Sequence, residues 1–396
     1  MNRFLLVPIL VLTAFLGTFN PAWAKDPKEP KEPREITVGG LFDLSGPTAA
    51  LGKEYAQGAQ DAAMFVNRGG GADGTPIRLL AGDFAYDQAR SGRLYQDYRK
   101  EDHVFAILGW GRADVEALYR RVERDKVVYL AADYDAALAD PRKSPYHFSI
   151  GVSLADQARL AMRYAKDQGG TKAAFILPDL PYALGPVKAG REYAEEIGLK
   201  IGPQIFVGLR AVDVAPQLAE LAAFDPDFTW LGGTTVSTAA VLKEAARMRL
   251  RTRFLINTWG VEPDLVRLAG EAVAGRAWGF LPTRPFGWDV PETAHIKGVV
   301  GERQYSSLYH QGWASMIVLA EGLKRARLAG KLTGPGLKAA LETLSDFETG
   351  GLTPPLTFTS GDHRPAAACG LYTFTGGKPS LAADVKIARN VKYLGW

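Results

Sequence analysis

Short, almost wholly apolar runs recur along this chain, and a longer stretch with the spacing of an amphipathic helix follows each of them. The first run covers residues 36–42, and the stretch at residues 53–67 places its apolar side chains on one helical face (Ala59, Ala62, Ala63 and Val66). Strands that are apolar throughout are typical of a parallel sheet whose two faces are both covered by helices. The alternation therefore predicts an α/β fold.

This alternation of strands and helices runs through the chain twice. The first series continues with strands at residues 76–81, 104–108 and 127–130. The second series has strands at residues 173–177, 204–207, 228–231 and 254–256. Two series of similar length predict two doubly wound lobes, each with its own parallel sheet.

The pattern changes after about residue 283. Helical stretches precede a tail rich in glycine and proline, in which residues 370–375 resemble a strand; the stretches are residues 298–309, 312–328 and 336–344. A tail of this kind can return to complete both lobes. We therefore expect lobe 1 to contain residues 35–150 and 283–345, lobe 2 to contain residues 151–282 and 346–396, and crossing strands to join them.

The first residues have the features of a secretory signal. A basic start with Arg3 precedes an apolar run at residues 4–19, and Ala22-Trp23-Ala24 has the form of a cleavage site. The run is short for a membrane span, which needs about 20 residues; an uncleaved anchor is the alternative. We expect residues 1–24 to be removed and the mature chain to be exported. Residues 25–34 predict a charged, proline-spaced tether that cannot form a core.

Few residues of the chain have the patterns required for catalysis or metal binding. The single cysteine, Cys369, excludes an intrachain disulfide and any site built from several cysteines. The five histidines lack metal-site spacing, and the sequence contains neither a nucleophile elbow nor a phosphate-binding loop. The 47 lysines and arginines are interspersed with 43 aspartates and glutamates, which leaves no basic face for nucleic acid. We expect a non-enzymatic chain with no metal, no cofactor and no nucleic-acid partner.

The informative positions are the junctions at which a strand ends and a helix begins. Ligands of doubly wound sheets bind beyond the carboxyl ends of the strands, where helix N-termini present free N–H groups. In the predicted lobes these junctions are residues 44–47, 108–114, 131–135, 178–182, 232–235 and 257–260. Aromatic side chains and a few polar groups gather there, and this combination suits a cleft for a small molecule.

Four segments of the chain resemble the Leu/Ile/Val-binding type of periplasmic solute-binding protein. They are ITVGGLFDLSGPTAALG at residues 36–52, NRGGGADGTPI at 67–77, YHQGWASMIVLAEGL at 309–323 and FTSGDHR at 358–364. The second segment fits the family's N-x-x-G-G-x-x-G-x-x-I turn. The resemblance spans residues 35–396 and implies a two-lobe periplasmic clamp that closes on a solute. It also implies the permease and ATPase subunits of an ABC importer as partners, and we expect the chain itself to be a monomer.

The amino-acid site of this family does not carry over cleanly. Members that bind α-amino acids use a serine after the third strand, and that position is Ala113 here, preceded by Arg112. Their next hydroxyl group, a threonine after the fourth strand, corresponds to Tyr134. The glutamate that pairs with the ligand ammonium corresponds to Trp259, whereas the aromatic side chain of the second lobe persists as Tyr182.

The loss of this glutamate bears on the charge of the ligand. An ammonium group that is buried without a carboxylate partner is costly. The change therefore argues against an ordinary amino acid unless another carboxylate substitutes, and the candidates are Asp114, Asp133 and Asp179. Each of these aspartates follows a strand, where it can equally cap a helix.

Aromatic side chains take the place of the missing polar groups: Trp110, Tyr134, Tyr182 and Trp259, with Phe84 and Tyr86 after the second strand. Such a set can stack on a flat ligand or hold a cation against the ring faces, although the tryptophans can instead pack within the walls. Arg112 can bind a ligand carboxylate through two hydrogen bonds, or it can pair with Asp114 of this chain.

The sequence therefore predicts capture of a small organic solute, apolar or aromatic, with or without a carboxylate or amide group. One alternative is a branched-chain or other amino acid with a rearranged ammonium site, and another is a ligand-sensing ectodomain partner. The predicted ligand-binding residues are Trp110, Arg112, Ala113, Asp133, Tyr134, Tyr182, Thr234, Trp259 and Gly260.

Overall fold

The structure, a computed structural model, describes residues 34–261, 264–375 and 378–395. The predicted signal at residues 1–24 and the tether up to residue 33 lie outside the described residues. Residues from Glu35 onward belong to one unit of the fold. Within the described ranges, no helix combines the length and the apolar character that a membrane crossing requires.

The first sheet is parallel throughout and is formed by the apolar runs of the first part of the chain. Its strands are β1 (Ile36–Phe42), β2 (Ile77–Asp83), β3 (Ala106–Gly109), β4 (Val128–Ala131) and β5 (His147–Phe148). They stand side by side in the order β2-β1-β3-β4-β5. Every residue of β1, β3 and β4 is buried, which explains why these sequences are apolar without alternation.

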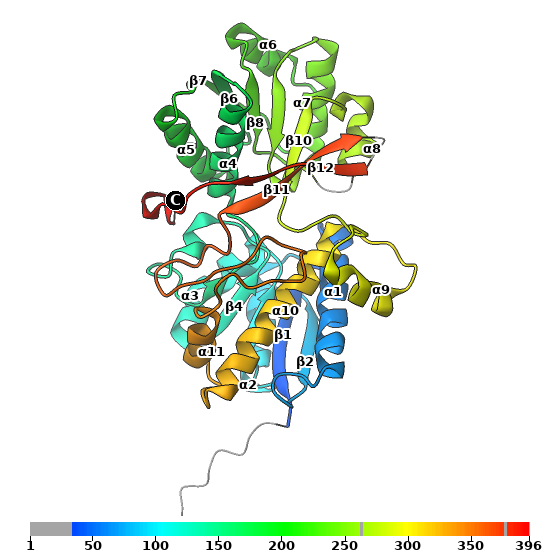
Figure 1. The fold of residues 1–396 in the computed structure, drawn as a ribbon, viewed down its shortest axis with the longest axis vertical. Helices are drawn as coiled ribbons and strands as arrows, with labels where there is room; N and C mark the ends of the chain where they lie inside the picture. Colours follow the sequence, from blue (N-terminus) through cyan, green and yellow to red (C-terminus); the bar gives the residue numbers. More distant parts are fainter. Residues whose placement is uncertain (1–33, 262–263, 376–377, 396) are drawn as a thin grey trace, which may run out of the picture. The chain divides into compact units, whose positions relative to one another are not determined.

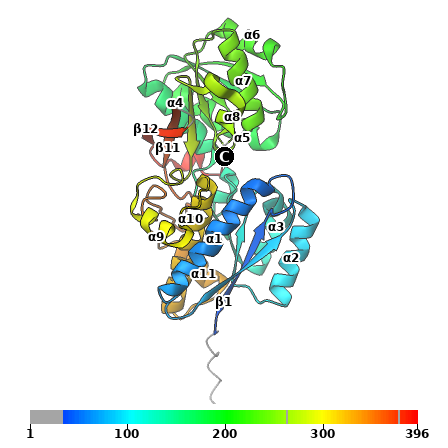
Figure 2. The same ribbon diagram turned by 90° about the vertical axis from the view of Figure 1, so that its right-hand side faces the viewer.

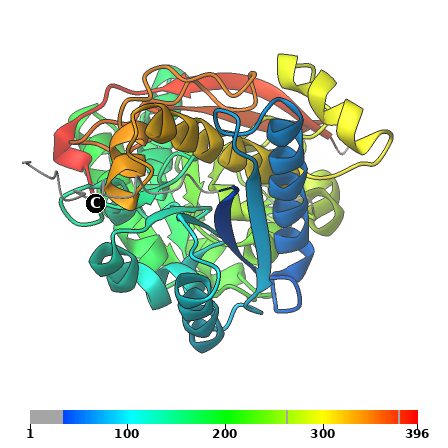
Figure 3. The same ribbon diagram turned by 90° about the horizontal axis from the view of Figure 1, so that it is seen from below.

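Helices cover both faces of the first sheet, as the sequence predicts. Helices α1 (Ala49–Arg68) and α10 (Ser307–Leu328) lie along one face, and α2 (Gln88–Lys100) and α3 (Arg112–Asp125) lie along the other (Figure 3). The two helices of the first pair touch through glycines: a Cβ on Gly58 would lie 2.0 Å from the carbonyl oxygen of Tyr309. This contact fixes a helix from the last third of the chain against lobe 1.

The second sheet repeats the strand order of the first and then extends it. Its parallel strands are β6 (Lys172–Leu177), β7 (Lys200–Phe206), β8 (Phe228–Leu231), β9 (Arg253–Ile256) and β10 (Ala277–Leu281), in the order β7-β6-β8-β9-β10. Two antiparallel strands, β11 (Ala368–Thr375) and β12 (Lys378–Lys386), follow β10 at the edge (Figure 1). Its helices are α4 (Leu154–Asp167), α5 (Pro181–Glu196), α6 (Ala215–Phe224), α7 (Thr235–Arg247) and α8 (Leu265–Ala269). The predicted α/β fold with two sheets is confirmed.

The region after β10 departs from the prediction in one respect. Instead of a helix at residues 298–309, the structure has α9 (Pro291–Val300) and a separate α10. Gly301 ends α9 with a φ of 63°, and the Ser306 hydroxyl then caps α10 by accepting a hydrogen bond from the amide of Leu308. The helical spacing of the sequence continues across this turn, so periodicity alone does not reveal it.

Chain segments pass between the two sheets at residues 149–153, at residues 282–290 and between α11 (Gly334–Leu341) and β11. In Figure 2 the strand β1 points toward the second lobe, so the carboxyl ends of the first sheet face the crossing region. The last crossing segment packs on lobe 1, where the ring of His363 stacks on Phe148 with their centroids 4.2 Å apart. The residue numbers at which the lobes divide stay a prediction.

Candidate functional site

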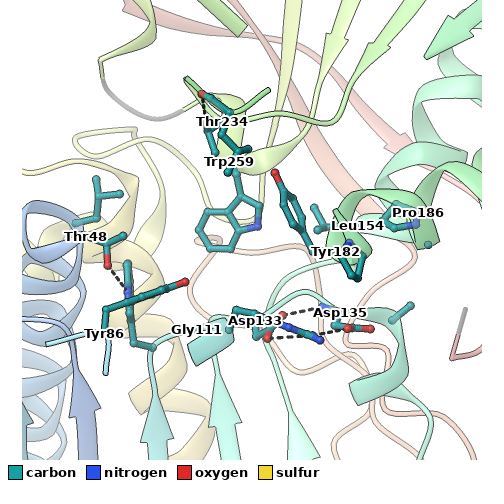
Figure 4. Close-up of a pocket in the computed structure, with 17 residues that line it drawn as sticks. Thr48, Tyr86, Gly111, Asp133, Asp135, Leu154, Tyr182, Pro186, Thr234 and Trp259 are labelled. Atoms are coloured by element: carbon teal, nitrogen blue, oxygen red, sulfur yellow. Dashed lines mark hydrogen bonds and ion pairs between the residues drawn. The ribbon is translucent and has the colours of Figure 1, made fainter. Parts of the chain in front are cut away.

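A cavity of about 340 Å³ lies between the two sheets, beyond the carboxyl ends of their parallel strands. Both lobes line it, through Thr48, Leu51, Tyr86, Trp110, Gly111, Arg112, Asp133, Asp135, Ala136, Leu154, Pro181, Tyr182, Gly185, Pro186, Leu209, Thr234 and Trp259. These residues follow strands or begin helices, which is where doubly wound sheets bind ligands. Figure 4 shows Trp259 and Tyr182 on one side of this space and Tyr86 and Asp133 on the other.

Six of the nine residues that the sequence predicts for ligand binding line this cavity, namely Trp110, Arg112, Asp133, Tyr182, Thr234 and Trp259. The other three lie outside its lining. Ala113 is buried in the first turn of α3, and Gly260 is buried at the end of the 3-10 helix η2 (Thr258–Gly260). Tyr134 is buried, and its hydroxyl donates a hydrogen bond of 2.7 Å to Oε1 of Gln311.

Several lining residues were absent from the sequence prediction, among them Thr48, Asp135, Leu154 and Leu209. The spacing of Asp135 from Asp133 could have identified it as a lining residue. In extended chain, residues i and i+2 face the same side, so Asp133 and Asp135 reach the cavity while the intervening Tyr134 faces away from it. Of the two further aromatic residues named from the sequence, Tyr86 lines the cavity and Phe84 is fully buried.

The loop after β1 is held by the carboxylate of Asp43. Its Oδ2 accepts hydrogen bonds from the amide and the hydroxyl of Thr48, at 2.8 and 2.7 Å, and its Oδ1 accepts one from the amide of Gly46. The Thr48 hydroxyl oxygen in turn accepts a 2.9 Å hydrogen bond from Nε1 of Trp110. Because this chain of bonds joins two loops, the tryptophan ring is fixed in the wall of the cavity.

Tyr86 reaches the cavity from a constrained turn. Both Ala85 and Tyr86 have positive φ angles, 52° and 59°, a conformation that non-glycine residues adopt only with local support. The Asp83 carboxylate gives this support by accepting the amides of Leu44 and Ala85, each at 2.9 Å. Although partial burial opposes the shift, the hydroxyl of Ser45 and these two amides lower the pKa of Asp83. The turn therefore presents the tyrosine ring in one orientation.

Asp114 is a structural residue at the start of α3. Its fully buried carboxylate accepts the amides of Trp110 and Gly111 at 3.0 and 2.8 Å, and the hydroxyl of Tyr129 donates to it as well. Burial raises the pKa of Asp114 to about 7, against these hydrogen bonds, which lower it. The alternative in which Arg112 pairs with Asp114 is not realised, because the Asp114 oxygens are taken by these three donors.

Arg112 is held by other carboxylates of its own lobe. Its Nε donates to Glu116 at 2.6 Å, and its Nη1 donates to Asp135 at 2.5 Å. The same Nη1 lies 3.8 Å from Oδ2 of Asp133. One guanidinium is therefore surrounded by three carboxylates. A ligand carboxylate would have to share Arg112 with them.

Asp133 stands at the edge of this cluster and is only 7% exposed. Its Oδ1 accepts the amide of Asp135 at 3.0 Å, but within the described residues its Oδ2 has no hydrogen-bond donor. Burial and the neighbouring charge of Asp135 raise the pKa of Asp133 to about 6, although Arg112 acts in the opposite direction. A buried carboxylate with an unused oxygen is a candidate for contact with a solute. By contrast, Asp179, the third acidic candidate, is exposed and outside the lining.

None of the described residues that line the cavity from lobe 2 has a charged side chain. Trp259 lies in η2, where the amide of Thr258 donates to Gln157 and the side chain of Asn257 accepts the amide of Gly260. Tyr182 lies in the first turn of α5, and burial raises the pKa of its hydroxyl to about 12. The Thr234 hydroxyl donates to the carbonyl of Leu209, so it is used within the wall. This surface offers ring faces and apolar groups.

Comparison with known proteins identifies the family to which this chain belongs. A family described as periplasmic binding protein matches residues 35–378. The chain belongs to this family, as a type I periplasmic binding protein of ABC transporters. The Leu/Ile/Val-binding protein homolog 1 of Brucella abortus is 22% identical to this binding protein over 275 residues, which cover 67% of this chain and 69% of the relative.

Solved structures share the fold of this periplasmic binding protein. An ABC transporter substrate-binding protein of Aeropyrum pernix has a TM-score of 0.79 and 28% identity, covering 91% of this chain and 98% of its own. A branched-chain amino acid ABC transporter protein of Thermus thermophilus with bound valine has a TM-score of 0.77 and 21% identity, covering 89% and 97%. A solute-binding protein of R. palustris in complex with benzoate has a TM-score of 0.73 and 17% identity, covering 91% and 99%.

The chemistry of the lining limits what the candidate site can bind. Among the residues that the structure describes, no group of three or more histidine, cysteine, aspartate or glutamate side chains is arranged to hold a metal ion. The lining combines mostly apolar surface with a few polar groups, as small-molecule sites do. Asp133 can accept a hydrogen bond from a solute, and the aromatic rings can cover its apolar part.

Proposed function

We propose that this chain is the periplasmic solute-binding component of an ABC importer and that it captures a small, largely apolar or aromatic solute. The cavity between the lobes would hold the solute, and hinge movement of the lobes would report occupancy to the permease and ATPase subunits. In this proposal the chain acts as an exported monomer and makes or breaks no covalent bond. Family membership supports the transport role, and the nature of the lining supports the class of solute.

The observation that carries the proposal is the set of aromatic side chains around the cavity, Tyr86, Trp110, Tyr182 and Trp259. They come from both lobes, so a flat or apolar solute between them would touch each lobe and favour the closed clamp. The volume of about 340 Å³ is at the small end for ligand pockets. It therefore suits a solute no larger than a single ring with a short substituent.

A second candidate is an amino acid with a rearranged ammonium site. Asp133 favours it, since its Oδ2 lacks a donor and would accept a hydrogen bond from an ammonium group. The carboxylate of the amino acid would then have to reach Arg112 past Glu116 and Asp135, which already accept its hydrogen bonds. That competition makes the amino acid the weaker of the two candidates. A ligand-sensing role would use the same cavity with a different partner.

A thermal-shift screen of the mature chain from Lys25 tests the proposal. The panel contains branched-chain and aromatic amino acids, aromatic carboxylates and amines, short amides and urea. A ligand at 100 times its Kd adds about 2.7 kcal/mol of stability, so a shift of several degrees is expected for aromatic probes. Trp259→Ala should abolish the shift, and the control Phe206→Ala, which changes an exposed aromatic residue on β7, should keep it.

The possible outcomes of this screen separate the candidates. A shift with leucine and none with aromatic amines, carboxylates or amides would support the amino acid. A shift that survives Trp259→Ala would place the ligand outside the cavity and contradict the proposal. If no member of the panel shifted the melting temperature, the proposed class of solute would be wrong.

A further inference from the structure

The ionisable side chains of the cavity lining leave a surplus of negative charge. The lining contains one cation, Arg112, and two anions, Asp133 and Asp135, all of them on lobe 1. Glu116 lies behind this lining and binds the same guanidinium at 2.6 Å. The positive charge of Arg112 is therefore more than balanced by the protein itself, and none of the described lining residues of lobe 2 is charged.

Tyr86, in the loop after β2, lies in the same surplus of negative charge. Burial first, and then the carboxylates of Asp114, Asp133, Glu116 and Asp43, raise the pKa of the Tyr86 hydroxyl to about 12. Because Tyr86 lines the cavity on the other side of the lobe 1 wall from Asp133 and Asp135, the negative potential extends across the wall rather than staying at one carboxylate.

The opposite wall complements this potential. The face of an aromatic ring carries negative charge and attracts cations, with tryptophan the strongest of the ring types. Trp259 and Tyr182 present their rings to the cavity from lobe 2 (Figure 4). A cation in this space would therefore lie between aromatic rings on one side and a carboxylate surplus on the other, whereas the carboxylate surplus would repel an anion.

We propose that the solute of this cavity is a small organic cation with one positive charge, whose charged group lies at Asp133 and whose apolar body lies against Trp259 and Tyr182. This inference deepens the proposed function and rests on it, since it names the charge class of the same solute. It also assigns Arg112 a positioning role. The guanidinium holds Asp135 and Glu116 in place and does not bind a ligand carboxylate.

Three probes with one ring and different charges test the inference. Benzylamine is a cation, benzyl alcohol is neutral and benzoate is an anion, so that calorimetric titration at pH 8 compares charge at nearly constant shape. We expect benzylamine to bind at least tenfold more tightly than benzyl alcohol, and benzoate to bind more weakly than both. Tighter binding of benzoate would overturn the inference, and equal binding of benzylamine and benzyl alcohol would overturn it too.

Variants separate this inference from the proposed function. Asp133→Asn should reduce benzylamine affinity at least fivefold and leave benzyl alcohol affinity unchanged, with Asp135→Asn as a second variant if the first fails to fold. The control Asp179→Asn changes an exposed aspartate outside the cavity and should alter neither affinity. If any of the probes binds and Trp259→Ala abolishes its binding, the proposed function stands whatever the charge preference. If none of the three probes binds, both the inference and the proposed function are wrong.

Discussion

The two walls of the cavity differ in the chemistry they offer. Lobe 1 supplies every charged residue among the described lining residues, in a cluster where the guanidinium of Arg112 lies within 4 Å of the carboxylates of Asp133 and Asp135. Lobe 2 supplies two prolines, two leucines, one glycine, one threonine and the rings of Tyr182 and Trp259. The two sheets share one strand order, so this difference arises in the loops after the strands and not in the framework. We infer a division of roles in which lobe 1 selects charge and lobe 2 provides apolar contact.

The largest effect is expected for the lobe 2 wall. Trp259→Ala should weaken the binding of benzylamine about a hundredfold, or about 3 kcal/mol, because it removes both ring contact and cation–π attraction. Trp259→Phe should recover much of this loss. Calorimetric titration measures both, and the melting temperature of the ligand-free protein serves as the control. If Trp259→Ala unfolds the protein, the ring is needed for packing, for instance against Tyr134 at 5.5 Å.

On the lobe 1 wall, Asp133→Asn should weaken cation binding while it stabilises the ligand-free protein. The pKa of Asp133 is raised from 3.8 to about 6 in the folded state. The protonated form of Asp133 therefore stabilises the fold fully below a pH of 3.8, the pKa of this group in the unfolded chain. This stabilisation is lost as the pH rises through 6, which lowers the free energy of unfolding by about 2–3 kcal/mol at neutral pH. Asparagine avoids this cost and can still accept the amide of Asp135. Chemical denaturation at pH 7.5 should show the gain, and a loss of stability there would refute the argument.

The pH dependence of binding tests the contribution of the lobe 1 wall separately from that of the lobe 2 wall. Benzyltrimethylammonium keeps its charge at every pH, so any change in its affinity comes from the protein. Asp133, with a pKa of about 6, faces Arg112, Asp135 and Glu116, and its protonation removes the negative charge nearest the solute. We expect affinity to fall several-fold between pH 8 and pH 5. An affinity that stays constant over this range would show that Asp133 does not face the charged group.

The smallest effect is expected for Tyr182→Phe. The Tyr182 hydroxyl is buried and has no hydrogen-bond partner within the described residues. Removing an unpaired polar group is close to neutral for stability, and the ring that faces the cavity stays in place. Benzylamine affinity should therefore change less than twofold, measured by the same titration. A large loss would show that the hydroxyl binds the solute.

The sequence was sufficient to predict the sheets but not every strand. Apolar runs such as Ile36–Phe42 and Phe228–Leu231 coincide with β1 and β8 because parallel, fully covered strands need no alternation. The strand β5 has only two residues, and β12 mixes proline and lysine with exposed positions. Neither strand has an alternation of apolar and polar residues that can be recognised in the sequence. Their positions depend on pairing partners that are distant along the chain.

Part of the candidate site could also be predicted, because it lies where the predicted strands end. Junction residues such as Trp110 and Trp259 were found because the carboxyl ends of strands locate the ligand in this class of fold. Leu154 follows the short β5, and its junction was invisible without that strand. The partners of Arg112 were not predicted, and the pairing with Asp114 that the sequence left open does not form, because Asp114 caps α3 with its carboxylate. The packing of the folded chain determines which charged side chains form ion pairs.

The most direct test is a crystal structure of the mature chain with benzylamine. The division of roles predicts the ammonium group within hydrogen-bond distance of the Asp133 carboxylate, the ring against Trp259 and Tyr182, and Arg112 still bound to Asp135. An ammonium group turned toward lobe 2, or a ligand outside the cavity, would contradict it.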